Sequence, residues 1–293
     1  MPTKREHWVT SGDFLLYAVA EGNPEATPIV LVHGYPDNHS VWDKVAEALS
    51  QEYLVIRYDV RGAGRSDKPA RTRDYRLALL AKDLQAVVNA IIPDQSFHLV
   101  AHDWGSIQSW ESVTDPDLQQ RIRSYTSISG PCLDHVGFWI RNQIGSPANG
   151  GTTKVLRQLA SSWYVFLFQL PLLPEMIWKA GLDKVWPNYL KTQEQVEDAR
   201  FSPWQKADGQ YGVKLYRANF LPRLLRPRPR HTRCPVQVII PTRDAYVGRH
   251  LTEHLVHWTG KLTLQELDAP HWAPLTEPDA ICQSVGSFVT ANR

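Results

Sequence analysis

Short apolar runs, each ending at turn residues, alternate with stretches of helical periodicity along most of the chain. The helical pattern is clearest in residues 75–91, where apolar side chains recur every three or four positions. This alternation is typical of an α/β fold, and we expect a mostly parallel sheet with helices on both faces. The expected strands are an opening hairpin of residues 7–9 and 14–18, followed by residues 28–32, 54–58, 98–101, 124–129, 236–240 and 262–267.

The alternation stops between residues 131 and 230. We therefore expect a core of residues 1–130 and 231–293, with a helical cap of residues 131–230 inserted between the sixth and seventh strands. Ligands of open parallel sheets bind beyond the carboxyl ends of the strands, so such a cap would cover the site. Later helices are expected at residues 153–169, 192–199, 209–221 and 251–258, and from an N-cap at Thr276 onward.

Composition and charge narrow the class of protein. A hydrophobic content of 43% and a charged content of 21% are those of an ordinary globular chain. The formal net charge of +2 gives no electrostatic reason to expect a nucleic acid or an anionic membrane as partner. The arginine- and proline-rich stretch at residues 217–233 is expected to be a solvated surface connection.

Cysteine usage and the N-terminus bear on the compartment. Cys132, Cys234 and Cys282 lie far apart, which argues against a disulfide framework or a zinc site and favours a reducing compartment. The N-terminal residues show no signal-peptide pattern, so we expect a cytoplasmic protein. Residues 163–178 are apolar but interrupted by prolines, and no membrane association is expected. The sequence leaves the oligomeric state open, with a homodimer as one alternative.

The strongest chemical signal is the run His102-Asp103-Trp104-Gly105 at the end of an expected strand. A nucleophile elbow requires small residues two positions before and two positions after the nucleophile, because the strand-to-helix turn is tight. Ala101 and Gly105 meet that requirement around Asp103. The chain contains no Gly-x-Ser-x-Gly motif, so an esterase is not expected. An acidic helix cap is the alternative structural interpretation.

The type of nucleophile selects the reaction. An ionised aspartate can displace a leaving group at saturated carbon and form an alkyl ester, whereas serine suits acyl transfer. Hydrolysis of that ester requires a general base, and a histidine oriented by a carboxylate is suited to this. Asp103, Asp244 and His271 occur in the nucleophile–acid–base order of α/β-hydrolases, and the last two each follow an expected strand. Asp134 is an alternative for the acid.

A second motif, His33-Gly34-Tyr35-Pro36, follows the third expected strand. Gly34 permits close approach of the backbone, and the amides of Tyr35 and Trp104 would form an oxyanion hole for ester hydrolysis. The Tyr35–Pro36 peptide bond is a candidate for the cis form.

Over essentially its whole length the chain resembles the α/β-hydrolase-fold epoxide hydrolases. The resemblance implies that Asp103 is the nucleophile, His271 the base and Asp244 its orienting acid. The motif at residues 33–36 matches the oxyanion motif of that family. A small hydrophobic epoxide and water are the implied reactants, without cofactor or metal, and detoxification of epoxides is the expected role.

The resemblance also implies two cap tyrosines whose hydroxyls hold the epoxide oxygen. Tyr164 stands shortly before a Phe-Gln-Leu-Pro run, and Tyr216 lies in a Tyr-Arg-Ala-Asn context. Ring opening produces an alkoxide, which leaves poorly unless a donor stabilises it. The structural alternative is an aromatic cap core, which the 11 tyrosines and 11 tryptophans of the chain make a serious competitor.

Two further functions remain as alternatives. A haloalkane dehalogenase shares the aspartate elbow and would use Trp104 to bind halide, but its usual asparagine is Tyr35 here. A non-catalytic hydrolase-fold binding protein is the other, although the ordered triad argues against it. The cap also resembles that of a bacterial subgroup in which the hydrolase precedes a short-chain dehydrogenase domain. No glycine-rich dinucleotide fingerprint occurs in these 293 residues.

Overall fold

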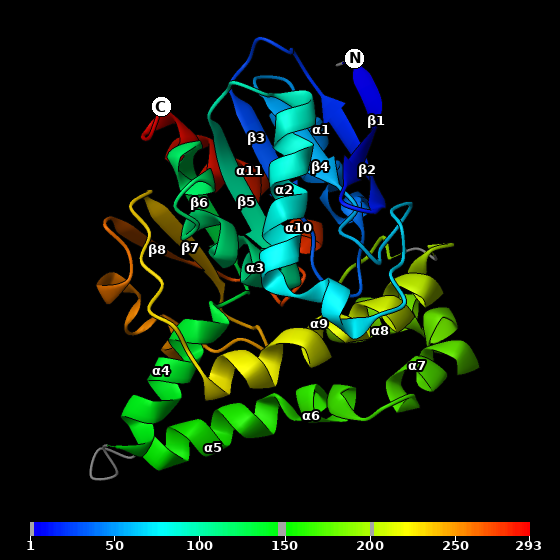
Figure 1. Cartoon of the computed structure of the whole chain (residues 1–293), viewed down its shortest axis with the longest axis vertical. Helices are drawn as coiled ribbons and strands as arrows, with labels where there is room; N and C mark the ends of the chain where they lie inside the picture. Colours follow the sequence, from blue (N-terminus) through cyan, green and yellow to red (C-terminus); the bar gives the residue numbers. More distant parts are fainter. Residues whose placement is uncertain (1–2, 146–150, 200–201) are drawn as a thin grey trace.

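The computed structural model describes residues 3–145, 151–199 and 202–293. Its centre is an eight-stranded sheet with the order β1-β2-β4-β3-β5-β6-β7-β8 (Figure 1). β1 pairs antiparallel with β2, β2 pairs antiparallel with β4, and the remaining neighbours are parallel. The strands are β1 (Lys4–Ser11), β2 (Phe14–Glu21), β3 (Pro28–Val32), β4 (Leu54–Tyr58), β5 (Phe97–His102), β6 (Ile122–Ile128), β7 (Val236–Pro241) and β8 (Leu262–Leu267).

All eight expected strands are present, and β3, β4 and β8 have the predicted bounds. β3 and β4 are buried along their whole length because helices cover both faces of the sheet. Successive side chains of β3 point to opposite faces: Val30 and Val32 join the core beneath α2 and α3, whereas Ile29 and Leu31 join the core beneath α1 and α11. These helices are α1 (Asp43–Leu49), α2 (Leu77–Ile91), α3 (Trp104–Val113) and α11 (Pro278–Thr290).

A group of helices occupies the chain between β6 and β7 and forms the predicted cap (Figure 1). It lies beyond the carboxyl ends of the parallel strands, on the side of the molecule opposite the two chain ends. Its elements are α4 (Leu133–Ile144), α5 (Gly151–Ser161), α6 (Trp163–Gln169), α7 (Leu173–Ile177), the π-helical turn η5 (Trp178–Leu182), α8 (Asp183–Gln193) and α9 (Gln205–Leu225).

Several predicted helix bounds are wrong. The helix expected at 192–199 is absent, because Gln195 adopts a positive φ of 56° and the chain turns after α8. The helix expected at 153–169 is two helices that meet at Ser162. Residues 251–258 contain two short 3₁₀ turns instead of an α-helix. The last helix is capped by Glu277, since Thr276 ends the preceding short helix α10 (Ala273–Thr276).

The basic stretch at residues 217–233 is not a solvated connection throughout. Arg223 and Arg230 each pair with both Glu111 of α3 and Asp134 of α4, and their side chains are only 12–13% exposed. The composition suggested a surface connection because these two carboxylates are distant in sequence. Buried charges of this kind are tolerated when they are paired, and here the pairs join the end of the cap to the core.

Within the described residues, no single helix is long and apolar enough to cross a membrane. One bent pair of helices, Trp163–Gln169 with Leu173–Gln193, meets the criterion by length and composition only.

Candidate active site

Asp103 lies in the tight turn between β5 and α3, with backbone angles φ 51° and ψ −122°. A non-glycine residue in this region is strained, by about 1–3 kcal/mol, and such strain is typical of functional sites. The turn leaves no room for side chains around it. A Cβ at Gly105 would lie 2.2 Å from the Val32 carbonyl oxygen, and one at Gly34 would lie 2.5 Å from Asp103 Oδ2. The small residues of the motif therefore have a direct steric cause.

His271 lies between two carboxylates. Its Nε2 is 3.4 Å from Asp103 Oδ1, and its Nδ1 is 2.9 Å from Asp244 Oδ2. Asp244 is buried at the end of β7 and also accepts hydrogen bonds from the amides of Tyr246 (2.8 Å) and Val247 (3.0 Å). The three predicted residues are thus in contact in the predicted order, with Asp244 on the far side of the ring from Asp103.

Burial would lower the pKa of His271, but the carboxylates of Asp244 and Asp103 raise it well above its usual range. Burial conversely favours the neutral form of Asp244, and the charge and hydrogen bond of His271 more than offset this, so the pKa of Asp244 is lowered. The ring thus has a fixed orientation and a raised affinity for a proton.

The oxygens of Asp103 have different surroundings. Oδ2 accepts a hydrogen bond from the Tyr35 amide at 2.9 Å, whereas Oδ1 is the oxygen nearest His271. The Tyr35–Pro36 peptide is cis. The Tyr35 hydroxyl donates to the Gly209 carbonyl (3.1 Å) and accepts from Trp178 Nε1 (2.8 Å), so the residue whose amide contacts Asp103 is also bonded to the cap.

His33 supports this loop and does not line the cavity above Asp103. The Val60 amide donates to its Nε2 at 2.9 Å, so Nδ1 carries the hydrogen and donates to the Gly34 carbonyl at 2.8 Å. Burial lowers the pKa of His33 to about 4, which keeps the ring neutral. We predicted His33 as part of the oxyanion and substrate-binding motif. In the structure both nitrogens of its ring bond backbone groups, so the side chain supports the loop.

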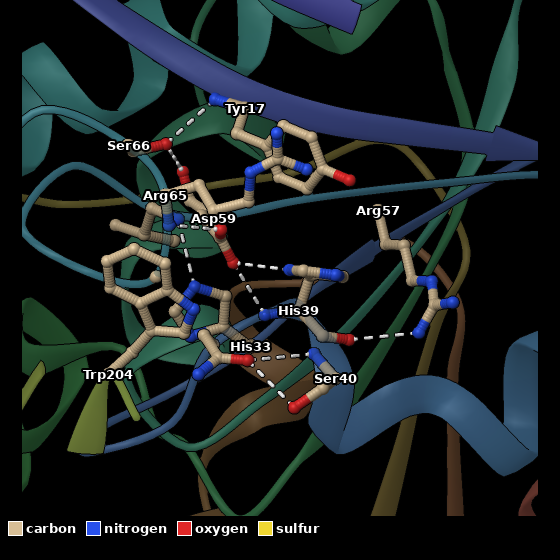
Figure 2. Close-up of polar contacts among 12 residues, drawn as sticks. Tyr17, His33, His39, Ser40, Arg57, Asp59, Arg65, Ser66 and Trp204 are labelled. Atoms are coloured by element: carbon tan, nitrogen blue, oxygen red, sulfur yellow. Dashed lines mark hydrogen bonds and ion pairs between the residues drawn. The ribbon is translucent and has the colours of Figure 1, made fainter. Parts of the chain in front are cut away.

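The neighbouring loop is held by a buried carboxylate (Figure 2). Asp59 accepts hydrogen bonds from the His39 amide (2.8 Å), His39 Nδ1 (2.7 Å) and the Arg65 amide (2.7 Å). Ser66 donates to the Asp59 carbonyl at 2.6 Å and accepts from the Tyr17 amide at 2.9 Å. This network joins the loops after β3 and β4 beneath the site, and it fixes the backbone that carries Tyr35.

Both predicted cap tyrosines lie at the cavity that contains Asp103. Tyr164 of α6 and Tyr216 of α9 have ring centroids 6.0 Å apart, and both line the same cavities as Asp103. Tyr216 is buried and its ring contacts those of Tyr35 and Trp104. Burial raises the pKa of both tyrosines, so their hydroxyls remain protonated donors.

Two cavities meet Asp103. The larger cavity, of about 250 Å³, has aromatic walls that include Trp163, Trp186 and Tyr246 together with His271. The apolar cavity, of about 90 Å³, extends in the direction of α4, α5 and α6 and is lined mainly by aliphatic and aromatic side chains. Within the described residues, no three His, Cys, Asp or Glu side chains are grouped so that they could hold a metal ion.

Two other residues singled out in the sequence, Trp104 and Asp134, take no part in the contacts among Asp103, His271 and Asp244. Trp104 is buried, follows Asp103 and packs its ring against Tyr216 and Phe220. Asp134, the alternative acid, pairs with Arg223 and Arg230 and makes no contact with His271. Asp244, and not Asp134, accepts the hydrogen bond that His271 Nδ1 donates.

Sequence reasoning missed several residues of the site. Glu194 accepts a hydrogen bond from the His271 amide at 3.0 Å, and Trp272 Nε1 donates to Asp37 at 2.8 Å. Burial raises the pKa of Asp37 to about 7, and the Trp272 hydrogen bond only partly counters this. Tyr246 places its ring 4.8 Å from that of His271. Tyr246 and Trp272 could have been found from the sequence, because they lie within two residues of Asp244 and His271. Glu194 lies in a cap loop without a recognisable sequence pattern.

A family model for the α/β-hydrolase fold matches residues 27–278. The chain belongs to the α/β-hydrolase fold family. Among curated proteins it is similar to "Probable oxidoreductase EphD" of Mycobacterium tuberculosis, with 30% identity over 92% of this chain and 46% of that protein. It is also similar to "Epoxide hydrolase 3" of Xenopus tropicalis, with 33% identity over 59% of this chain and 40% of that protein. The chain therefore spans about half or less of the length of these relatives.

Solved structures of epoxide hydrolases share the fold of this chain. A variant of the Bacillus megaterium enzyme with its diol product superposes with a TM-score of 0.79 at 19% identity, over 97% of this chain and 100% of that one. An epoxide hydrolase from metagenomes of hot environments gives a TM-score of 0.76 at 22% identity, over 98% and 99% of the two chains. At this level of identity the likeness establishes the fold. The curated relatives confirm the resemblance to epoxide hydrolases.

Proposed function

We propose that the protein is an epoxide hydrolase that converts a hydrophobic epoxide into a vicinal diol through a covalent ester on Asp103. The observation that carries this proposal is the placement of Asp103 between two sets of groups. His271 and the Tyr35 amide lie on the core side. The two protonated tyrosines of the cap line the cavity that Asp103 shares with them.

In the first step, Asp103 Oδ1 attacks a ring carbon. A bond forms between Oδ1 and that carbon while the bond from the carbon to the epoxide oxygen breaks. The oxygen takes a proton from Tyr216 or Tyr164, because an alkoxide is a stronger base than a phenolate. Oδ1 is the attacking oxygen since Oδ2 is held by the Tyr35 amide.

In the second step, His271 removes a proton from water, which attacks the carboxyl carbon of the ester. The negative charge develops on Oδ2, where the Tyr35 amide already donates a hydrogen bond. Collapse of this intermediate breaks the ester C–O bond, and the departing alkoxide takes the proton held by His271 to complete the diol. The second proton of the water returns to the tyrosine phenolate, which restores the tyrosine and the Asp103 carboxylate. Esterification also removes the charge of Asp103, one of the two carboxylates that raise the pKa of His271, so the pKa of the ring falls at the stage that needs a base.

The aromatic and aliphatic walls of both cavities support a hydrophobic substrate. The pair of tyrosines favours an epoxide oxygen over a halide, because a departing halide requires no proton. A haloalkane dehalogenase would have a halide-binding asparagine at position 35. Here the residue is Tyr35, and its hydroxyl is hydrogen-bonded to the cap.

A His271→Gln variant tests the proposal. It should open styrene oxide but hydrolyse the ester slowly, and intact-protein and peptide mass spectrometry should find the substrate attached to the peptide that contains Asp103. The wild-type protein should release diol, and halide release from a matched panel of haloalkanes should be negligible. Absence of both diol formation and an Asp103 adduct would overturn the proposal.

A further inference from the structure

The cap carries exposed apolar side chains in a regular pattern. Four of them recur at spacings of three and four residues along α5 and α6, two more lie at the turn into α7, and all six are 36–64% exposed. Within α5 and α6 this spacing places side chains on one face, and the chain then bends between α6 and α7. The members of this apolar cap stripe are Leu156, Leu159, Trp163, Phe166, Leu170 and Leu173.

The apolar cap stripe lies on the outer part of the molecule. α5 and α6 follow each other along the edge of the cap that is farthest from the sheet (Figure 1). α4 packs against α5 and α9 packs against α6, so these two helices separate the stripe from the core. Neither chain end lies near it.

The exposed charges of the segment that carries the stripe have one sign. From Gly151 to Gln193, a segment that the structure describes completely, every exposed charged residue is basic. Of the two acidic residues there, Asp183 is buried and Glu175 is paired with Arg217. Lys154 lies 3.7 Å from Glu253, outside the segment. The exposed basic residues are Lys154, Arg157, Lys179, Lys184 and Lys191.

The stripe also borders both cavities that contain Asp103. Leu159 and Phe166 form part of the wall of the apolar cavity, and Trp163 forms part of the wall of the larger cavity. Side chains that face solvent on the cap therefore also face the space in front of the nucleophile.

We propose that the apolar cap stripe docks on the surface of an anionic lipid bilayer and that epoxides dissolved in the bilayer enter the site through the cavities beside it. An apolar helix face flanked by lysine and arginine is the pattern of helices that lie in a membrane interface. The docking is inferred from the surface alone, whereas the delivery of lipid-borne epoxides rests on the proposed function. The net charge of +2 did not reveal this surface because it averages the basic cap with the rest of the chain.

A second copy of the chain fits the stripe less well. A coiled-coil partner needs a straight seam, but the helix pair Trp163–Gln169 and Leu173–Gln193 is bent by 99°. A two-fold dimer through this face would also bring the same basic residues of both copies together, which is unfavourable.

Vesicle flotation tests the docking. The wild-type chain should bind phosphatidylcholine vesicles containing phosphatidylglycerol more than vesicles of phosphatidylcholine alone, and added salt should weaken this binding. The double variant Leu156→Glu/Leu173→Glu, which leaves the cavity walls intact, should reduce binding at least about tenfold. Its matched control is Val256→Glu/Leu264→Glu, at positions of similar exposure outside the cap, which should bind like the wild type. Lys179→Gln/Lys184→Gln should weaken binding to the anionic vesicles alone.

Rates of epoxide hydrolysis distinguish docking on the bilayer from delivery of epoxides out of the bilayer. With styrene oxide in solution, Leu156→Glu/Leu173→Glu should turn over like the wild type, whereas with a long-chain fatty epoxide in anionic vesicles it should lose most of its rate. Equal rates on both substrates would overturn delivery from the bilayer. No binding of the wild type to anionic vesicles would overturn docking, as would a dimer that the double variant dissociates in light scattering. Lack of turnover of any epoxide, with vesicle binding intact, would instead overturn the proposed function.

Discussion

At the scale of single residues, the proposed mechanism gives the two oxygens of Asp103 separate tasks, because the backbone holds one of them. The Tyr35 amide already binds Oδ2, so the donor that the proposed oxyanion needs is in place before reaction. Tyr216 is buried among Tyr35, Trp104 and Phe168, and this packing fixes where its hydroxyl points. In the proposed mechanism, the groups that act on the epoxide oxygen are therefore held by the cap, and those that act on the ester are held by the core.

Replacing Tyr216 by Phe removes one donor to the epoxide oxygen. We expect kcat/KM for ring opening to fall about a hundredfold, with the fold unchanged, because the alkoxide loses a hydrogen bond that strengthens as charge develops. Stopped-flow kinetics would measure the opening step. Tyr211→Phe, on the same helix but outside both cavities, is the control. An unchanged rate would contradict the role of Tyr216 as a donor.

The Asp244→Asn variant should change the pKa and the orientation of His271, the proposed general base. The Asp244 carboxylate raises the pKa of His271, and the ring must be neutral to act, so the rate of ester hydrolysis should rise as the pH increases through that pKa. Without the carboxylate this rise should shift to lower pH, while the plateau falls about 10²–10⁴-fold because the ring loses its orientation. Rate–pH profiles would show both effects. Asp268→Asn, exposed on the His271 loop, should change neither.

At the scale of elements, the turn from β5 to α3 is the most constrained part of the site. Asp103 has a positive φ, and the backbone of β3 passes close to Gly105. Neighbouring strand ends carry the other residues: Asp244 follows β7, and His271 follows β8. Parallel strands bring these ends together at one edge of the sheet, so residues distant in sequence meet in order.

A Gly105→Ala substitution tests this constraint. The new methyl group would lie 2.2 Å from the backbone oxygen of Val32, and backbone atoms cannot move away cheaply. We expect a loss of about 1–3 kcal/mol in the free energy of unfolding, and chemical denaturation would measure it. At Gly145 the nearest atom to an added Cβ is 3.4 Å away, so Gly145→Ala should be nearly neutral. Equal stability of the two variants would contradict the steric explanation.

At the scale of the whole molecule, the cap is joined to the core by buried polar groups as well as by apolar contacts. Asp208 of α9 accepts hydrogen bonds from Asn38 (2.9 Å) and from the Gly64 amide (2.7 Å) of the core loops. Burial raises the pKa of Asp208 to about 8, although both hydrogen bonds act in the opposite direction. The junction therefore contains a carboxyl that binds its proton more tightly in the folded state than in the unfolded state.

This raised pKa has a definite effect on stability. The contribution of Asp208 is fully present below about pH 4 and is lost as the pH rises through about 8. An Asp208→Asn variant keeps the size of the side chain without the charge, so its Tm should fall less than that of the wild type between pH 5 and pH 8, by at least about 3 °C. Calorimetry would measure the difference. Asp198→Asn, whose side chain is 66% exposed, should retain the wild-type pH dependence.

The local signals in the sequence predicted most of the core and part of the site. Buried parallel strands such as β3 and β4 are continuous apolar runs, so their bounds were found directly. The turn at residues 101–105 has a steric requirement that a few residue types satisfy. Glu194 and Asp37 were missed because their partners, the His271 amide and the Trp272 indole, are more than 70 positions away in the chain.

The sequence by itself determined which segments form strands, the place of the inserted cap and the candidate nucleophile, because these depend on periodicity and on local steric rules. Only the tertiary structure decided that His271 Nδ1 contacts Asp244 rather than Asp134, and that Arg223 and Arg230 are buried in ion pairs. It also decided that the apolar residues of α5 and α6 face outward. These features depend on which distant side chains share one small volume, and no local pattern encodes that.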